Sequence, residues 1–377
     1  MQKNKSKLFF YTICLSFSFQ QVFAWTDHMA ITKASFVDEA WEQVSFEPIE
    51  SVLSSLEIAG KTPESIDAFG KLANIHPEKV RWNWNPAGEG IASAFDVLMY
   101  SSQEPDEGMD QELWLADYQK YMGGKTGLSS QGIRHMYFPE FTWKMPFATF
   151  HYPFEKMGFA PERAQLYFNL AVQAKNTGHK FWAYRFLGMG LHYVQDMTQP
   201  YHASQFGSIW LLPVKTLVFS GFDAFVGETK RIVSNFHLAF EEYVNFIMQS
   251  SVSVRTPASV LNAFQLPEGD EQLRYDLSNR ELTVTEAMEQ LSLVSARYAI
   301  DIASQEQNLI GDLLIAKELD LGSGFYDKKG RPKIDFQKIE LDPALENKRQ
   351  SFHKSMYQAL SNVGLMTRWY LKKFQKS

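Results

Sequence analysis

Three side chains of metal-ligand type lie within the apolar segment from Gly188 to His202, with the spacing His192-x3-Asp196-x5-His202. The apolar residues around them recur with helical periodicity, so His192 and Asp196 should project from one helix face. Pro200 should end or bend this helix and let His202 approach from the next turn. Imidazoles and a carboxylate suit zinc and its neighbours better than calcium or magnesium. A core histidine satisfied by a nearby carboxylate is the alternative.

A second pair of this type, His237 and Glu241, again stands one helical turn apart. Taken alone, such a pair is more often part of a solvated helix face, because charged helix surfaces are common. The aromatic residues around it, among them Phe236 and Phe240, favour a helix that is mostly buried. An inward His/Glu pair then needs compensation, which a metal ion supplies.

The amino terminus has the pattern of a secretory signal peptide. Three lysines precede a short apolar and hydroxyl-rich run, and Val22-Phe23-Ala24 fits the small-x-small cleavage rule. We expect residues 1–24 to be removed, which makes Trp25 the first residue of a secreted or periplasmic protein. Its free amine and carbonyl oxygen could chelate zinc together with His28, for which an ordinary loop histidine is the alternative.

These residues, taken in order, resemble the bacterial zinc-dependent phospholipases C, which share a helical fold with fungal single-strand-specific nucleases. The resemblance runs the length of the chain. The central signature is the strongest match, and the other motifs add weight through their order. The matching positions are Trp25 and His28, Asp106 in Glu-Pro-Asp-Glu-Gly, His135 in Arg-His-Met-Tyr-Phe-Pro, then His192, Asp196 and His202, and finally His237 and Glu241.

The resemblance implies a centre of three zinc ions. Asp196 would bridge two of them, and Asp106 would also be the general base. His151 and His179 are substitutes should His135 not be a ligand. The implied partition is Trp25 and His28 on one bridged ion, Asp106, His135 and His192 on the other, and His202, His237 and Glu241 on the third.

The reaction implied by the resemblance is hydrolysis of a glycerophospholipid, with phosphatidylcholine expected, to diacylglycerol and a phosphorylated head group. Glu107, Tyr137, Phe138 and Glu140 are candidates for reading a cationic head group through rings and charge. A nuclease on the same metal scaffold is one alternative, although the nucleases usually end their ligand set with His-x3-Asp. A non-catalytic, zinc-stabilised protein that associates with membranes is the other.

Composition agrees with an exported enzyme that acts on lipid. The net charge of the 377 residues is −6, and loss of the three signal lysines makes it more negative, so nonspecific nucleic-acid binding is disfavoured. Cys14 is the only cysteine and lies in the signal segment, so the mature chain would have no disulfide. Neither an obligate protein partner nor a lipid anchor is indicated.

Helical patterning predicts an all-α fold, with residues 25–377 forming one catalytic domain and no separate carboxyl-terminal membrane-binding domain. The plainest helices are expected at Pro161–Asn176, Phe181–Asp196, Asn235–Met248, Thr285–Leu309 and Asn347–Phe374, with a strand-like piece at Lys333–Ile339. An apolar insertion at about 204–234 fits two interpretations equally, namely an element that dips into a membrane interface or a buried helix of a larger core.

Overall fold

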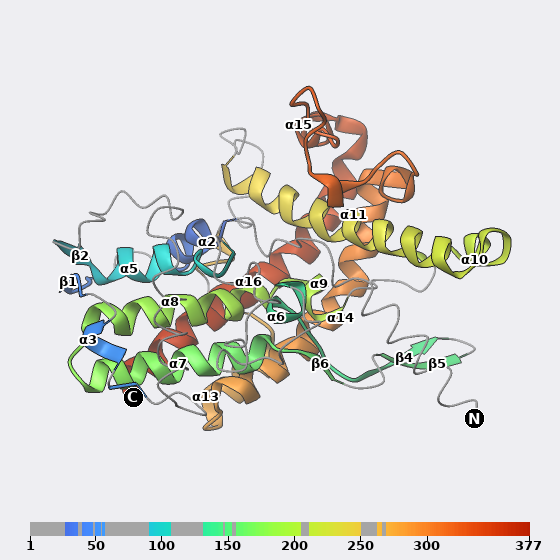
Figure 1. Cartoon of the computed structure of the whole chain (residues 1–377). Helices are drawn as coiled ribbons and strands as arrows, with labels where there is room; N and C mark the ends of the chain where they lie inside the picture. Colours follow the sequence, from blue (N-terminus) through green and yellow to red (C-terminus); the bar gives the residue numbers. More distant parts are fainter. Residues whose placement is uncertain are drawn as a thin grey trace.

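The computed structural model is mostly helical, which confirms the predicted all-α class (Figure 1). Its helices pack against one another in layers, and the described residues contain no central sheet. The structure describes residues 27–36, 40–47, 50–53, 55–56, 90–106, 131–145, 148–152, 156–204, 211–249, 262–265 and 269–377. The predicted signal peptide and Trp25 therefore lie outside the described residues.

A pair of helices, α7 (Ala160–Asn176) and α8 (Lys180–Asp196), forms the centre of the first half. A short turn through Gly178, whose φ is 87°, joins them and reverses the chain. Helix α8 is buried along almost its whole length because α5 (Ala94–Ser101) covers another of its faces. Apolar residues on nearly all sides are what a fully buried helix requires.

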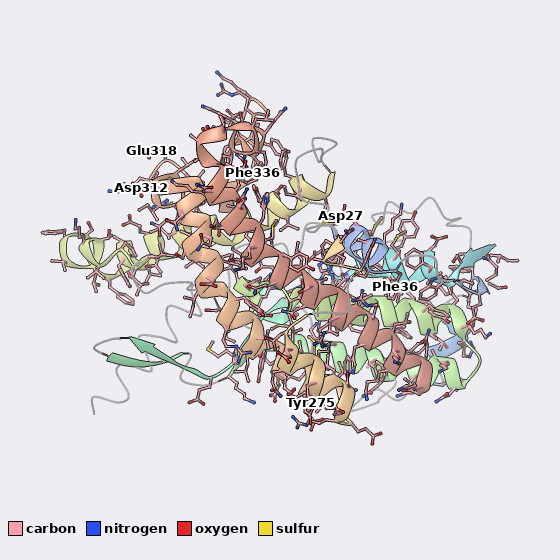
Figure 2. The ribbon with its side chains drawn as sticks, turned by 180° about the vertical axis from the view of Figure 1, so that it is seen from behind. Asp27, Phe36, Tyr275, Asp312, Glu318 and Phe336 are labelled. Atoms are coloured by element: carbon pink, nitrogen blue, oxygen red, sulfur yellow. The ribbon has the colours of Figure 1, made fainter. Side chains whose placement is uncertain are left out.

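Two long helices tie the halves of the molecule together. Helix α14 (Val284–Ile310) begins with a capping box between Thr283 and Glu286, and α16 (Glu346–Lys376) packs along it (Figure 2). Each contributes to two apolar cores, one around α7 and α8 and the other around α11 (Phe222–Gln249). The metal-ligand residues predicted on α8 and α11 are thus held by one continuous framework.

All five long helices predicted from the sequence are present, and α11 begins thirteen positions earlier than expected. The shorter elements are α2 (His28–Ser35), α3 (Glu50–Leu53), α6 (Gln131–His135), α9 (Pro200–Ala203), α10 (Val214–Ser220), α13 (Glu271–Asn279) and α15 (Phe336–Leu341), with 3₁₀ turns at Gly311–Ile315, Leu321–Ser323 and Pro343–Leu345.

The strands of the described chain form three two-stranded antiparallel ribbons. They pair β1 (Gln43–Ser45) with β2 (Ile91–Ser93), β3 (Tyr137–Phe138) with β6 (Met157–Gly158), and β4 (Phe141–Met145) with β5 (Ala148–Tyr152).

The strand-like prediction at Lys333–Ile339 was wrong. Asp335 accepts a hydrogen bond from the backbone N of Lys338 and starts helix α15 there. A capping interaction of this kind outweighs an apolar alternation that spans only a few residues.

The predicted insertion at about 204–234 contains α10 and the first half of α11. Helix α10 has no buried residue, so the interpretation as a buried core helix is wrong for α10, whereas Phe225 and Ile232 in the first half of α11 are buried. Among the residues that the structure describes, no helix combines the length and the apolar character needed to cross a bilayer.

Candidate metal centre

Eight of the nine predicted ligands converge in the interior, and the ninth, Trp25, lies outside the described part of the chain. All eight side chains are buried. Their donor atoms form three groups in which every donor lies within 4.8 Å of the others in its group. The groups are His28, Asp106 and His192, then His135, His192 and Asp196, and then His202, His237 and Glu241.

Helix ends and helical turns place these donors. His28 begins α2, whose N-cap Asp27 accepts a hydrogen bond from Ala30 N at 2.8 Å. His192 and Asp196 lie four residues apart on α8, as predicted, while α8 itself ends at Asp196. Pro200 starts the separate short helix α9, because its fixed φ suits a first helical turn, and α9 carries His202 inward.

The other donors come from three further segments. Asp106 closes the tight turns that follow α5, and its backbone N donates to the carbonyl of Gln103 at 3.2 Å. His135 is the last residue of α6. His237 and Glu241 occupy one turn of α11. Five helices and one turn region, spread over more than two hundred positions of sequence, therefore supply the centre.

Asp196 occupies the middle of the constellation. Its Oδ2 lies 2.8 Å from Nδ1 of His135 and 3.2 Å from Nε2 of His192. Its Oδ1 lies 3.3 Å from Nε2 of His28 and 3.8 Å from Nδ1 of His202. The two oxygens of one carboxylate thus face different histidines, as a bridging ligand between two ions requires.

Asp106 lies opposite Asp196 across the same histidines. Its Oδ1 is 3.7 Å from Nδ1 of His135 and 3.8 Å from Nε2 of His192, and its Oδ2 is 3.9 Å from Nε2 of His28. These distances exceed a hydrogen bond and leave space between the donors.

The third group is compact and borders the other two. Nε2 of His237 lies 3.1 Å from Nε2 of His202 and 2.9 Å from Oε1 of Glu241. The His202 Nε2 to Glu241 Oε1 distance is 3.6 Å. Two imidazoles and a carboxylate in this arrangement match a typical zinc donor set.

Neighbouring groups fix which nitrogen of three histidines faces the centre. Nδ1 of His192 donates to the carbonyl of Ser102 at 2.7 Å, and Nδ1 of His202 donates to the carbonyl of His135 at 2.9 Å. Nδ1 of His28 lies 2.8 Å from Oε1 of Gln195. In each case Nε2 is left to face the centre, which is the usual way a protein orients a metal-binding imidazole.

The spacing of the predicted ligands does not reveal these orienting groups. Gln195 and Gln199 are polar residues inside the apolar central motif, and Gln195 adjoins Asp196; the sequence offered no other signal for them. Gln199 Nε2 donates to Oε1 of Glu241 at 3.0 Å. The role of Ser102 depends on a backbone carbonyl, which no residue type reveals.

Burial and neighbouring charges keep the centre ready to coordinate a cation. Burial acts to raise the pKa of Asp196, but its electrostatic interaction with His192 and hydrogen bonds from His135 and His192 hold that pKa well below its ordinary value. Burial lowers the pKa of His192 to about 3, so this imidazole is neutral at pH 7. Burial raises the pKa of Asp106 to about 6. An ionised carboxylate and a neutral imidazole are the protonation states that bind metals.

His151 and His179 were the suggested substitutes for His135. His179 precedes α8 and pairs with Glu47, its Nδ1 lying 2.5 Å from Oε2 of that residue. The side chain of His151 is outside the described part of the structure. The substitutes for His135 are therefore not needed to complete the second group.

The structure describes three of the four residues suggested for head-group recognition. Tyr137 and Phe138 are buried, and the Tyr137 hydroxyl donates to Oε1 of Glu289 at 2.8 Å. Glu140 is exposed and Glu107 is outside the described residues.

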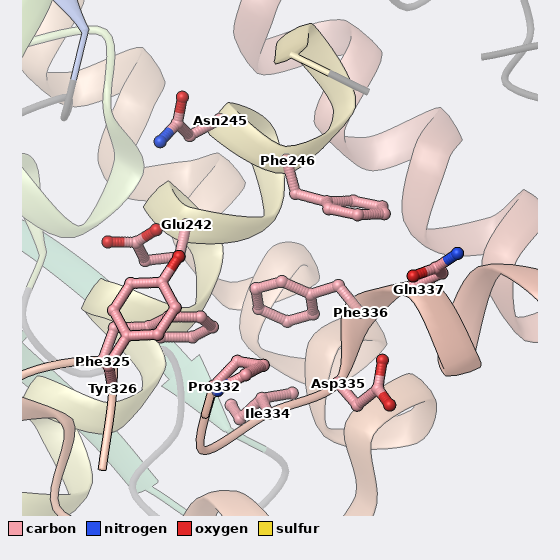
Figure 3. A pocket seen from close by; sticks show the side chains of 10 residues that line it. All are labelled: Glu242, Asn245, Phe246, Phe325, Tyr326, Pro332, Ile334, Asp335, Phe336 and Gln337. Atoms are coloured by element: carbon pink, nitrogen blue, oxygen red, sulfur yellow. The ribbon is translucent and has the colours of Figure 1, made fainter. Parts of the chain in front are cut away.

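A pocket on the surface lies between the end of α11 and the segment 325–337 (Figure 3). Glu242, Asn245 and Phe246 line it from α11, and the segment 325–337 supplies its other residues. None of the eight predicted ligands lines this pocket. Its position therefore says nothing about how a substrate reaches the buried donors.

The arrangement can hold divalent cations in three adjacent places. Imidazole nitrogens and carboxylate oxygens suit zinc, and no cysteine is involved. Clusters of this kind are suited to hydrolytic chemistry, in which cations polarise a phosphoryl or carbonyl oxygen and activate water.

Comparisons with known proteins identify no family for the chain. No protein-family model matches it, and no curated protein matches its sequence. Among solved structures, it is similar to a crystal structure of Clostridium perfringens alpha-toxin from an avian strain, with 11% sequence identity and a TM-score of 0.34. The match covers 93% of this chain and 64% of the toxin chain, so this chain spans a little under two thirds of that structure's length. A similarity this low carries no conclusion about activity, for which the residues of the centre are the evidence.

Proposed function

We propose that the protein is a metal-dependent phospholipase C, which hydrolyses glycerophospholipids to diacylglycerol and a phosphorylated head group. Phosphatidylcholine is the first substrate to test. The observation that carries the proposal is the placement of Asp196, one oxygen of which faces His135 and His192 while the other faces Nε2 of His28. The order of motifs along the sequence, which resembles the bacterial zinc-dependent phospholipases C, supports the choice of reaction.

The donors fit zinc on an observation independent of sequence. Nε2 of His28, Oδ1 of Asp196 and Oε2 of Glu241 are buried, and none of the three atoms makes a hydrogen bond within the described part of the chain. Leaving such polar atoms buried without a hydrogen bond is costly. A divalent cation coordinated between them would remove that cost.

The proposal assigns separate roles to the metal ligands and to the general base. His202, His237 and Glu241 would hold one ion, and His28, Asp106, His135, His192 and Asp196 would hold two more. Ions bound there would act as Lewis acids on the phosphodiester and would activate water. We assign Asp106 as the general base, since Asp106 Oδ1 borders His135 and His192 and is positioned to accept a proton from the attacking water.

The proposal includes export. We propose that residues 1–24 are removed and that the amine of Trp25 joins His28 as a ligand. Only three positions separate Trp25 from His28, whose ring lies in the first group. Amino-terminal sequencing of the protein recovered outside the cytoplasm tests this. A chain that starts anywhere other than Trp25 contradicts it.

One assay tests the proposed reaction. The purified protein, loaded with zinc, is offered phosphatidylcholine in detergent micelles and, separately, single-stranded DNA, each with and without a chelator. We expect release of phosphocholine and diacylglycerol that stops with chelator and returns with zinc. Release of nucleotides alone would favour the nuclease alternative. No turnover of either substrate at full zinc occupancy would favour a structural role for the metal.

A further inference from the structure

Helix α10 carries its large apolar side chains on the outside of the molecule. Phe219 is 83% exposed, Val218 69%, Val214 56% and Phe222, at the start of α11, 36%. We call these four residues the apolar tip. They lie within nine positions of sequence, whereas the other large exposed apolar residues of the described chain are scattered over separate elements. Single exposed apolar residues are ordinary, but a contiguous group marks a contact surface.

Helix α10 leaves Val214, Val218 and Phe219 exposed, whereas Thr216 and Leu217 are partly covered. Thr216 Oγ1 donates a hydrogen bond to the Glu228 carboxylate on α11, so a polar residue of α10 faces the protein. Val214 and Val218 lie one helical turn apart and are exposed, together with Lys215. A globular protein in water buries the apolar face and exposes the polar one. The large apolar side chains that α10 leaves exposed indicate that its outer face meets an apolar medium.

A second apolar element projects from the same end of the molecule. In both views, the β4–β5 ribbon and α10 extend at that end (Figures 1 and 2). The strand register aligns Phe141 with Tyr152 and Trp143 with Phe150. No other described strand pairs with this ribbon, and isolated two-stranded ribbons are marginally stable in water.

We propose that the apolar tip inserts into the interfacial layer of a phospholipid membrane and holds the protein on the surface that contains its substrate. A stable protein interface uses about 20–30 residues a side, far more than the seven residues of α10 can supply. Interfacial anchoring needs only a few aromatic and aliphatic side chains with a lysine beside them, which α10 provides. This inference rests on the proposed phospholipase C function.

The tip would act as an anchor separate from the catalytic centre. Helix α11 carries Phe222 at its start and His237 fifteen residues later, which corresponds to about 22 Å along the helix axis at 1.5 Å per residue. Phe222 therefore lies well away from His237, and Thr216 of α10 contacts Glu228, nine residues before His237. Anchoring instead raises the local concentration of lipid around the centre, so it should affect turnover of bilayer lipid and leave turnover of dispersed monomers unchanged.

The test compares a tip variant with a matched surface variant. The double substitution Val218→Ser with Phe219→Ser removes the most exposed apolar side chains of the tip. Tyr275→Ser is the control, because Tyr275 is 60% exposed on α13, an element away from α10 (Figure 2). Zinc-loaded proteins are sedimented with phosphatidylcholine vesicles, and hydrolysis is measured on the same vesicles and on short-chain phosphatidylcholine below its critical micelle concentration.

We expect the tip variant to lose vesicle binding and vesicle hydrolysis by about tenfold or more, with monomer hydrolysis within about twofold of the wild type, while Tyr275→Ser behaves like the wild type in all three assays. Hydrolysis of monomers together with unchanged vesicle binding by the tip variant would overturn the anchor but not the proposed function. Vesicle binding that depends on the tip, without hydrolysis of any lipid, would support the anchor and overturn the proposed function. Lipid-free light scattering that shows dimers in the wild type and monomers in the tip variant would assign the tip to self-association and overturn the proposal.

Discussion

Oε1 of Gln195 lies 2.8 Å from Nδ1 of His28, across 167 positions of sequence. Gln195 Nε2 donates in turn to Thr32 Oγ1 at 2.9 Å, which fixes the amide so that its oxygen faces the histidine. Nδ1 of His28 then carries the proton, and Nε2 is left to face Asp196 and Asp106. The residue next to the central carboxylate on α8 therefore decides whether a ligand from α2 presents a lone pair.

Replacing Gln195 by methionine should weaken metal binding. Methionine has much of the volume of glutamine but lacks the carbonyl oxygen that accepts a hydrogen bond from Nδ1 of His28. The imidazole of His28 therefore loses its fixed tautomer. We expect zinc affinity to fall by about 10–100-fold, as for other groups that orient metal ligands, with far-UV circular dichroism unchanged. Competition with a chromophoric chelator measures the affinity. The exposed Gln272→Met is the control, and equal affinities in both variants would contradict the role given to Gln195.

Asp196→Asn should weaken zinc binding more than the substitution of a residue that only orients a ligand. The substitution removes the charge that faces four histidines, so it should cost more than the about 10–100-fold typical of an orienting residue. Elemental analysis should find fewer zinc ions per chain, and hydrolysis should fall in parallel. Asp301→Asn, on an exposed part of α14, controls for loss of one aspartate. Wild-type zinc content in Asp196→Asn would rule out Asp196 as a bridging ligand.

The sequence predicted the helical class and the main helices because apolar periodicity is a local property. His192 and Asp196 were placed on one face of α8 by their spacing alone, and the structure has them there. The contact between His192 and the Ser102 carbonyl spans 90 positions. No local pattern encodes such a contact, because it depends on how α5 packs against α8.

Other features escaped prediction for different reasons. The β4–β5 ribbon is short, and its alternating residues lie beside stronger helical signals. The exposure of α10 could not be decided from composition, because a buried helix and an interfacial helix can have the same apolar content. The central motif made Asp196 the strongest prediction of the site, whereas Trp25 lies outside the described residues and stays a prediction.

Removal of metal should destabilise the folded protein. Without a cation, the buried carboxylate atoms Asp196 Oδ1 and Glu241 Oε2 keep no hydrogen bond within the described structure. We expect a chelator to lower the melting temperature and excess zinc to restore it, since zinc at 100 times its dissociation constant adds about 2.7 kcal/mol. Differential scanning calorimetry measures the shift. The same shift in Asp196→Asn as in the wild type would contradict this prediction.

Gly188→Ala should destabilise the fold at the contact between α8 and α5. A Cβ at this position would lie 2.5 Å from the carbonyl oxygen of Leu98 and 2.7 Å from Cβ of Ser101, so the helices must separate. We expect a loss of about 1–3 kcal/mol in the free energy of unfolding. Gly227→Ala on α11 meets nothing within 4 Å and should instead gain about 0.5–1 kcal/mol from helix propensity. Urea denaturation measures both changes, and a destabilisation of equal size in both variants would show that close packing at Gly188 is not the cause.

Glu306→Gln should make the free energy of unfolding fall less as pH rises. Burial raises the pKa of Glu306 well above its ordinary value of 4.5, while the Tyr201 hydroxyl donates to its Oε2 at 2.7 Å. The folded state keeps a proton that the unfolded state releases. The contribution of this carboxyl to the free energy of unfolding is therefore complete below about pH 4.5, and it is lost as pH rises toward the pKa of the folded state. Glutamine resembles the protonated acid and still accepts from Tyr201.

The variant should therefore become more stable than the wild type as pH rises from 5 to 8, by up to about 1.4 kcal/mol per pH unit. Urea denaturation at a series of pH values measures the difference, with the exposed Glu281→Gln as control. A difference between Glu306→Gln and the wild type that stays constant with pH would mean that Glu306 is already ionised in the folded protein. Its hydrogen bond from Tyr201 would then be holding a buried carboxylate.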